Sequence, residues 1–229
     1  MSELHSAARR AVRPFPGLLD QIETVAFRTA EPRPANSEPF RMLCTRLNHL
    51  KELNGLRTIA ISSPGAGEGK SFIAAHLALA QAELKDNLTV VCDFDFRRPV
   101  LHDMFGIPRT PGLADYLQNS VELHEVIKRI GLTNLYVIPA GCRHVNPLEL
   151  LTLPRAKQML EELPAAFDWI ILDTPPLLSA ADGNLLSTYS DGTLLVVRTA
   201  ATELNSIPLA IRSLSENNIV GIVVNGQIR

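Results

Sequence analysis

A glycine-rich segment, SSPGAGEGKS at residues 62–71, stands between an apolar run and a helical pattern. Glycines let backbone N–H groups curl around an anion, and the N-terminus of the following helix adds partial positive charge. In loops of this kind the lysine reaches the β- and γ-phosphates and the next hydroxyl binds Mg²⁺. The segment therefore predicts a nucleotide phosphate site, although Pro64 stands where the simplest form of the loop has a glycine. The residues expected to contact the nucleotide are Gly65, Ala66, Gly67, Glu68, Gly69, Lys70, Ser71 and Phe72.

Carboxylates follow two other apolar runs. WIILDTPP at 169–176 places Asp173 where a phosphate loop needs a metal-facing acid from a neighbouring strand. VVCDFDFRRP at 90–99 adds Asp93 and Asp95, which share a face if the run is extended. Two close carboxylates repel each other unless a cation lies between them, and Mg²⁺ and the nearby arginines would relieve this repulsion. Solvated turn acids are the simpler interpretation, but the pair also offers a group that accepts the proton of a hydroxyl during phosphate transfer.

Apolar runs of strand length alternate with helical patterns from Leu56 onward. The expected strands are 58–63, 88–94, 135–140, 169–174, 192–198 and 219–225. The expected helices are one that starts after an N-cap at Ser37 and those at 71–84, 147–163 and 203–217, with irregularities at Pro154 and Pro208. This alternation predicts an α/β fold of the three-layer P-loop NTPase kind, with a mostly parallel central sheet flanked by helices.

The composition allows a large hydrophobic core and narrows the possible function classes only slightly. The chain has 229 residues, a net charge of −2 and 46% hydrophobic residues, which favours one main domain. The near-neutral charge gives no support for a nucleic-acid partner. The three cysteines form no CxxC pair and are expected to be free thiols. No apolar run approaches the roughly 18 residues that a membrane span needs.

The first part of the chain differs in composition from the rest. Residues 1–36 are rich in Pro, Arg and Ala and predict a flexible N-terminal arm. Within this arm, the pattern at 17–27 suggests a short amphipathic helix, with a plain linker as the alternative. Residues 37–229 are expected to form the P-loop domain.

The three motifs resemble those of the bacterial tyrosine kinases of capsule and exopolysaccharide export, which are P-loop ATPases related to partition proteins. The family's phosphate loop resembles SSPGAGEGKS. Its DxDxR motif matches Asp93, Asp95 and Arg97, and its DxPP motif matches DTPP at 173–176. The resemblance covers the chain from about residue 37 and includes the connecting segments RRPVLHDMFG, GLADYL, IPAG, NPLELL and GIVVNG. It implies an ATP- and Mg²⁺-dependent protein-tyrosine kinase that regulates polysaccharide polymerisation and export.

The resemblance also implies roles for single residues. Lys70 is expected to hold the phosphates, and Ser71 to bind phosphate and Mg²⁺. Asp95 is expected in the metal shell, with Asp173 supporting the metal through water. Asp93 is the expected catalytic base. Lys70 and the three carboxylates form the predicted catalytic set.

Two further residues are assigned to the nucleotide. Arg97 belongs to the DxDxR motif and is expected to steady the acids or the phosphates. Asn225 aligns with an asparagine that contacts adenine in the wider superfamily. The expected partners are a tyrosine-bearing protein substrate and a membrane chain-length-determining protein, which would hold this cytoplasmic chain at the inner face of the membrane.

Two departures from the family pattern affect these expectations. Members usually carry an ExxRxxR helix that builds a ring-shaped homo-oligomer. Glu38 and Arg41 fit this motif, but Cys44 replaces the last arginine, so ring assembly is expected to be weaker or differently built. Many members also end in a tyrosine cluster. This chain ends at GIVVNGQIR, so either the target tyrosines lie on another protein or kinase activity is lost while nucleotide binding remains.

Two other functions stay open. A non-catalytic ATP-gated adaptor of the chain-length machinery would agree with both departures. A partition or positioning ATPase would usually carry a lysine at the position of Gly65, and it would not need the DxDxR pair.

Overall fold

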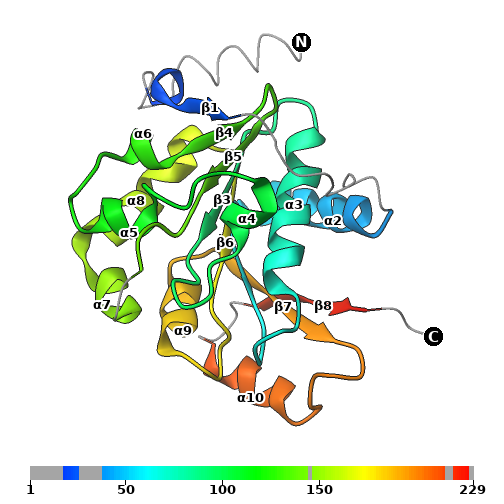
Figure 1. The fold of residues 1–229 in the computed structure, drawn as a ribbon. Helices are drawn as coiled ribbons and strands as arrows, with labels where there is room; N and C mark the ends of the chain where they lie inside the picture. The colour runs from blue at the N-terminus through cyan, green and yellow to red at the C-terminus, as the bar shows by residue number, and fades with distance from the viewer. Residues whose placement is uncertain (1–17, 26–37, 144–145, 215–218, 227–229) are drawn as a thin grey trace.

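The structure is a computed structural model that describes residues 18–25, 38–143, 146–214 and 219–226 (Figure 1). An eight-stranded sheet forms its centre, with the order β1-β4-β5-β3-β6-β2-β7-β8. Paired strands are parallel except for β4 and β5, so the predicted α/β class with a mostly parallel sheet is confirmed. The strands are β1 (Glu23–Val25), β2 (Thr58–Ser62), β3 (Thr89–Asp93), β4 (Lys128–Ile130), β5 (Leu135–Ile138), β6 (Trp169–Asp173), β7 (Gly192–Arg198) and β8 (Ile219–Asn225).

Helices cover both faces of the sheet (Figure 1). They are α2 (Glu38–Asn54), α3 (Lys70–Glu83), α4 (Leu101–Phe105), α5 (Leu113–Leu117), α6 (Leu123–Val126), α7 (Pro147–Thr152), α8 (Pro154–Ala166), α9 (Ala181–Thr188) and α10 (Ser206–Ser213), after a 3-10 turn, η1 (Leu19–Gln21). Strand β3 shows why two layers are needed. Val90 and Cys92 belong to one core and Val91 to the other, because successive side chains of a strand point to opposite faces.

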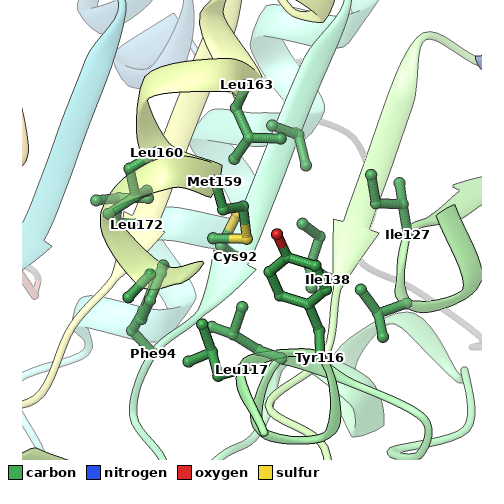
Figure 2. Close-up of a cluster of buried hydrophobic side chains, with 14 of the residues drawn as sticks. Cys92, Phe94, Tyr116, Leu117, Ile127, Ile138, Met159, Leu160, Leu163 and Leu172 are labelled. Carbon is green, nitrogen blue, oxygen red and sulfur yellow. The ribbon is translucent and has the colours of Figure 1, made fainter. Parts of the chain in front are cut away.

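The first core lies between the sheet and helices α5, α7 and α8. Figure 2 shows Met159 and Leu163 of α8 and Tyr116 and Leu117 of α5 around Cys92 of β3. Burial of this apolar surface supplies most of the favourable free energy of folding and holds the central strands rigidly.

The second core packs helices α2 and α3 on the opposite face. Leu47 of α2 and Leu77 of α3 are buried beside Trp169 of β6. Two hydrogen bonds fix the orientation of α2 on the sheet. Trp169 Nε1 donates to Asn48 Oδ1 at 3.0 Å, and Lys51 Nζ donates to the Asp168 carbonyl at 2.8 Å. Helix α2 was expected after Ser37 and is confirmed, but Ser37 itself lies outside the described residues.

The three central strands place the predicted motifs at one edge of the sheet. Strand β6 lies between β3 and β2, and all residues of the three strands are buried. The register pairs Asp173 with Asp93 on one side and with Ile61 on the other. Open α/β sheets bind ligands at the carboxyl ends of their strands, and this is where the acids and the glycine-rich loop meet.

The amphipathic helix predicted at 17–27 is wrong for the part that the structure describes. Leu19–Gln21 form a 3-10 turn, and Glu23–Val25 form β1, which pairs in parallel with β4. The sheet edge and the ion pair between Glu23 and Lys128, at 2.6 Å, override the helical pattern. Most of the expected arm lies outside the described residues, so the division at residue 37 stays a prediction.

The pattern expected as one helix at 147–163 is two helices. Pro154 begins α8, because proline lacks an N–H and fits best in the first turn of a helix; a second proline, Pro164, lies in the last turn of the same helix. Pro208 lies in the first turn of α10, where the same reasoning applies. The described part of the chain has no helix long and apolar enough to cross a membrane.

Candidate active site

The glycine-rich loop joins β2 to α3 through a backbone that only glycine suits at two positions. Gly67 has φ +81°, and Gly69, the N-cap of α3, has φ +95°. Side chains rarely adopt this left-handed region. A Cβ atom on Gly69 would also collide with the side-chain amide of Asn225, so a larger residue would have to displace this amide as well as adopt a strained backbone.

The peptide groups of this loop are oriented by donors from outside it. Arg198 Nη1 donates to the Gly67 carbonyl at 3.1 Å, and Asn225 Nδ2 donates to the Glu68 carbonyl at 2.9 Å. In a trans peptide the carbonyl and the following N–H point in opposite directions. The N–H groups of Glu68 and Gly69 therefore point away from these two donors, as a phosphate cradle requires. Asn225 thus supports the loop, and its predicted contact with adenine stays a prediction.

Side chains of the loop lie in different surroundings. Ala66 is exposed and Gly65 half-buried, whereas the Glu68 carboxylate is buried. Burial raises the pKa of Glu68, and hydrogen bonds from the Thr202 side chain and the Gly65 backbone oppose the shift.

Phe72 extends from the first turn of α3 and is 45% exposed. Its ring centroid lies 3.9 Å from that of His76 and 6.4 Å from that of Phe40. Phe72 is thus part of an aromatic cluster between α2 and α3, and its predicted contact with the nucleotide stays a prediction.

Asp93 ends β3 and is fully buried. Its Oδ1 accepts the N–H of Asp95 at 3.2 Å, and its Oδ2 accepts those of Val100 and Leu101 at 3.2 and 3.1 Å. Burial and the charge of Asp173 raise the pKa of Asp93 well above its ordinary value, against the effect of these N–H groups. The carboxylate is therefore held in one orientation and binds a proton more readily than an ordinary aspartate.

Asp95 faces the lysine of the loop. Its Oδ2 lies 2.8 Å from Lys70 Nζ, and its Oδ1 accepts the Arg98 N–H at 3.0 Å. Burial alone would lower the pKa of Lys70, but the charges of Asp173, Asp95 and Asp93 raise it above its usual value. Lys70 thus stays a cation among three acids.

Asp173 ends β6 between the other two motifs. Both of its oxygens are buried, and among the described residues neither has a hydrogen-bond partner of standard geometry. Burial raises the pKa of Asp173 to about 7, while Lys70 and the Ser71 hydroxyl lie close enough to favour its charged form. A buried carboxylate with unsatisfied oxygens beside a hydroxyl is suited to a cation or to water held by one.

The donor set fits Mg²⁺ and a nucleotide. Within the described ranges no three His, Cys, Asp or Glu side chains form a complete metal cage. Mg²⁺ does not require such a cage, because it keeps several waters and binds through one or two carboxylates together with phosphate oxygens. Ser71, Asp95 and Asp173 are the residues that would hold it.

Arg97 has a partner that was not predicted from the sequence. Its Nε and Nη2 donate to Asp182 Oδ2 of α9 at 3.2 and 3.1 Å, and its expected role toward the acids or the phosphates stays a prediction. Asp182 follows the DTPP turn by six residues, and an acid in the first turn of a helix is too common to single out from sequence.

Comparison with known proteins shows the family of this chain. The family model described as an AAA domain matches residues 56–218. Tyrosine-protein kinase YwqD of Bacillus subtilis is 31% identical over 199 residues, which cover 86% of this chain and 84% of that protein. The chain belongs to the bacterial tyrosine kinase family. The tyrosine-protein kinase ptk of Acinetobacter johnsonii is 36% identical over 191 residues, and there the chain spans only 26% of the relative's length.

Solved structures of this family share the fold. The kinase domain of the Escherichia coli tyrosine kinase ETK matches with a TM-score of 0.80 and 28% identity, over 88% of this chain and 82% of that one. The family resemblance found in the three motifs is thus confirmed across most of the bacterial tyrosine kinase domain.

Proposed function

We propose that this protein is an ATP-dependent protein-tyrosine kinase that regulates the polymerisation and export of a capsular or exopolysaccharide. The observation that carries the proposal is the meeting of Lys70 with Asp93, Asp95 and Asp173 at one sheet edge, beside the phosphate loop. A hydrolase needs only to position a water, whereas this site has a carboxylate beyond those suited to the metal.

The loop from Gly65 to Phe72 would bind the phosphates through its N–H groups and Lys70. Arg97 and Asn225 would complete the nucleotide site. When bound, ATP supplies the phosphoryl group and Mg²⁺ neutralises the charge that develops on it. The raised pKa of Lys70 keeps a full positive charge available to the same oxygens.

Asp93 would accept the proton of the tyrosine hydroxyl. Its raised pKa brings it closer to the working pH than an ordinary aspartate, which favours general-base catalysis. Three backbone N–H groups fix its orientation. A carboxylate oxygen can accept two hydrogen bonds, and Oδ1 accepts one of these three groups, which leaves it a further acceptor position.

The protein would act as a homo-oligomer and together with a membrane chain-length-determining protein at the inner face of the membrane. Glu38 and Arg41, the matching part of the family's assembly motif, are exposed on α2. An apolar groove beside them is lined by Phe40, Met42 and Phe72 and by residues of the edge strand β8. Exposed apolar surface of this kind supports an assembly role.

A non-catalytic ATP-gated adaptor is the second candidate. It is favoured by the engagement of both Asp93 oxygens with backbone groups, because a purely structural cap of α4 would make the same bonds. A positioning ATPase is disfavoured by Gly65, which stands in place of that class's lysine.

Anti-phosphotyrosine detection distinguishes the two candidates. The purified chain is incubated with ATP and Mg²⁺, with and without the cytoplasmic segment of its membrane partner. We expect a signal in the wild type that is lost in Lys70→Met and falls at least 100-fold in Asp93→Asn. Since Asp93 also caps α4, thermal unfolding is measured for each variant. ATP binding without phosphotyrosine on any component would exclude the kinase and favour the adaptor.

A further inference from the structure

The Arg97–Asp182 contact joins two parts of the chain that the motifs alone leave separate. Arg97 follows Asp95 in a tight turn, in which the Arg98 N–H donates to both the carbonyl and the side chain of Asp95. Phe94 and Phe96 are buried on either side of Asp95 and anchor this loop in the core. The position of Arg97 is thus coupled directly to that of the Asp95 carboxylate.

Asp182 lies in very different surroundings from its partner. The Asp182 side chain is 2% exposed, whereas that of Arg97 is 53% exposed. Two guanidinium N–H groups donate to one buried oxygen, an arrangement that lysine cannot reproduce. A buried carboxylate needs such a partner, because an uncompensated charge there is costly.

Helix α9 is in turn packed tightly against the turn that follows Asp173. A Cβ atom on Gly183, the neighbour of Asp182, would lie 2.7 Å from the Pro175 carbonyl. Asn184 Nδ2 also reaches the Leu177 carbonyl at 3.5 Å. The first turn of α9 is therefore packed against the DTPP turn and the residue that follows it.

We propose that Asp182 is a positioning residue of the phosphotransfer site. It binds the Arg97 guanidinium and thereby ties the loop that carries Asp95 to the turn that carries Asp173. These two carboxylates come from different strands, and a shared Mg²⁺ requires near-ideal spacing of its oxygen ligands. The inference rests on the proposed function, since it assumes that both acids face Mg²⁺.

Nucleotide binding measured across a range of Mg²⁺ concentrations tests this role. A fluorescent ADP analogue is the probe, so the readout does not depend on catalysis. We expect Asp182→Asn to raise the Mg²⁺ concentration for half-maximal binding about tenfold, within the range known for residues that support metal ligands. Binding without Mg²⁺ should change less than twofold. Arg97→Gln should show a similar loss and Arg97→Lys a smaller one, because lysine keeps the charge without the fork.

The double variant and a matched control make the test specific. Arg97→Gln with Asp182→Asn should be no worse than Arg97→Gln alone, because the second change removes a link that the first has already removed. Asp191 is the structural control. Its side chain accepts the N–H groups of Arg57 and Thr58 at 2.8 Å, at the amino ends of the central strands and away from the acids. Asp191→Asn should therefore lower stability without altering the Mg²⁺ dependence of binding.

The possible outcomes separate the inference from its basis. The inference is overturned if Asp182→Asn leaves the Mg²⁺ dependence of binding unchanged, or if the double variant shows the product of the two single effects. The metal site itself still stands in that case if Asp173→Asn loses the Mg²⁺ dependence. Binding that is independent of Mg²⁺ in the wild type and in Asp173→Asn overturns both the metal site and the inference. If Asp182→Asn does not fold, Arg97→Lys decides the question, since the charge opposite Asp182 is kept.

Discussion

Asp173 combines complete burial with two carboxylate oxygens that have no hydrogen-bond partner of standard geometry among the described residues. Its pKa in the folded protein, about 7, lies above the ordinary value of 3.8. The folded state therefore holds this proton more tightly than the unfolded state does. Its contribution to stability is complete below pH 3.8 and is lost as the pH rises through about 7.

Asp173→Asn should consequently stabilise the metal-free protein at high pH. At pH 8 the wild type keeps a buried charge that the amide lacks, so we expect an increase of about 1–3 kcal/mol in the free energy of unfolding. As the pH rises from 4 to 7, the free energy of unfolding should fall less steeply in the variant than in the wild type. It should still fall in both, because the raised pKa of Asp93 has the same effect. Urea unfolding at pH 5 and pH 8 measures both effects. The account would be contradicted by a variant that is less stable than the wild type at pH 8 and whose free energy of unfolding changes with pH as steeply as that of the wild type.

At the residue scale, the sequence was enough to identify side chains that belong to a recognisable motif. It was not enough to identify contacts between residues that are far apart in the sequence. Lys70, Asp93, Asp95 and Asp173 could be found because each lies at the end of a glycine-rich loop or at or just after the end of a strand, in a known order. The Asp182 contact with Arg97 spans 85 positions and depends on how α9 packs, which no local pattern encodes. The structural bonds of Asp93 to the start of α4 were hidden for the same reason.

Helix α2 carries Cys44 at a position that is buried in the core and not exposed for assembly. Cys44 occupies the position of the family's last arginine, but it is only 3% exposed and packs in the core with Leu47. Burial, with the charge of Glu83, raises the pKa of its thiol to about 12, so it is an inert apolar group. The exposed residues of the motif are Glu38 and Arg41.

Cys44→Arg should therefore destabilise the domain and not restore the family's assembly motif. A buried guanidinium without a partner should cost about 3 kcal/mol or more, whereas Cys44→Ala should cost about 1 kcal/mol. Thr45→Arg, at an exposed neighbouring position, is the matched control and should change stability by less than about 0.5 kcal/mol. Thermal unfolding and size-exclusion chromatography are the measurements. A stable Cys44→Arg protein that forms a larger oligomer would show that this position can reach the surface.

Strands made of apolar runs and the long helix α3 were predicted well, whereas helices of one turn and a three-residue strand were not. Strands β2, β3, β6, β7 and β8 and helix α3 lie within one or two residues of their expected ranges. Strand β4 and helices α4 to α6 span three to five residues each, too few for periodicity to identify. At 17–27 the helical pattern was overridden by pairing with the sheet edge.

The strand order is a property of the whole molecule that alternation could not supply. Alternating strands and helices predict a parallel sheet, but many orders satisfy the same pattern. The observed order places β6 between β3 and β2, and only this juxtaposition brings both acidic motifs to the phosphate loop. The structure brings the residues of these motifs together at the carboxyl ends of the central strands, and their roles in a shared site stay a prediction.

The fate of the γ-phosphoryl group tests the central claim most directly. ATP labelled at the γ-phosphate is followed in the wild type, Asp93→Asn and Asp95→Asn, with the partner's cytoplasmic segment present. We predict label on tyrosine in the wild type. In Asp93→Asn we predict at least 100-fold less transfer with nucleotide binding retained, and in Asp95→Asn a loss of Mg²⁺-dependent binding as well. Label that appears only as inorganic phosphate, or transfer that is unaffected by Asp93→Asn, would contradict the assignment of this site to tyrosine phosphorylation with Asp93 as its base.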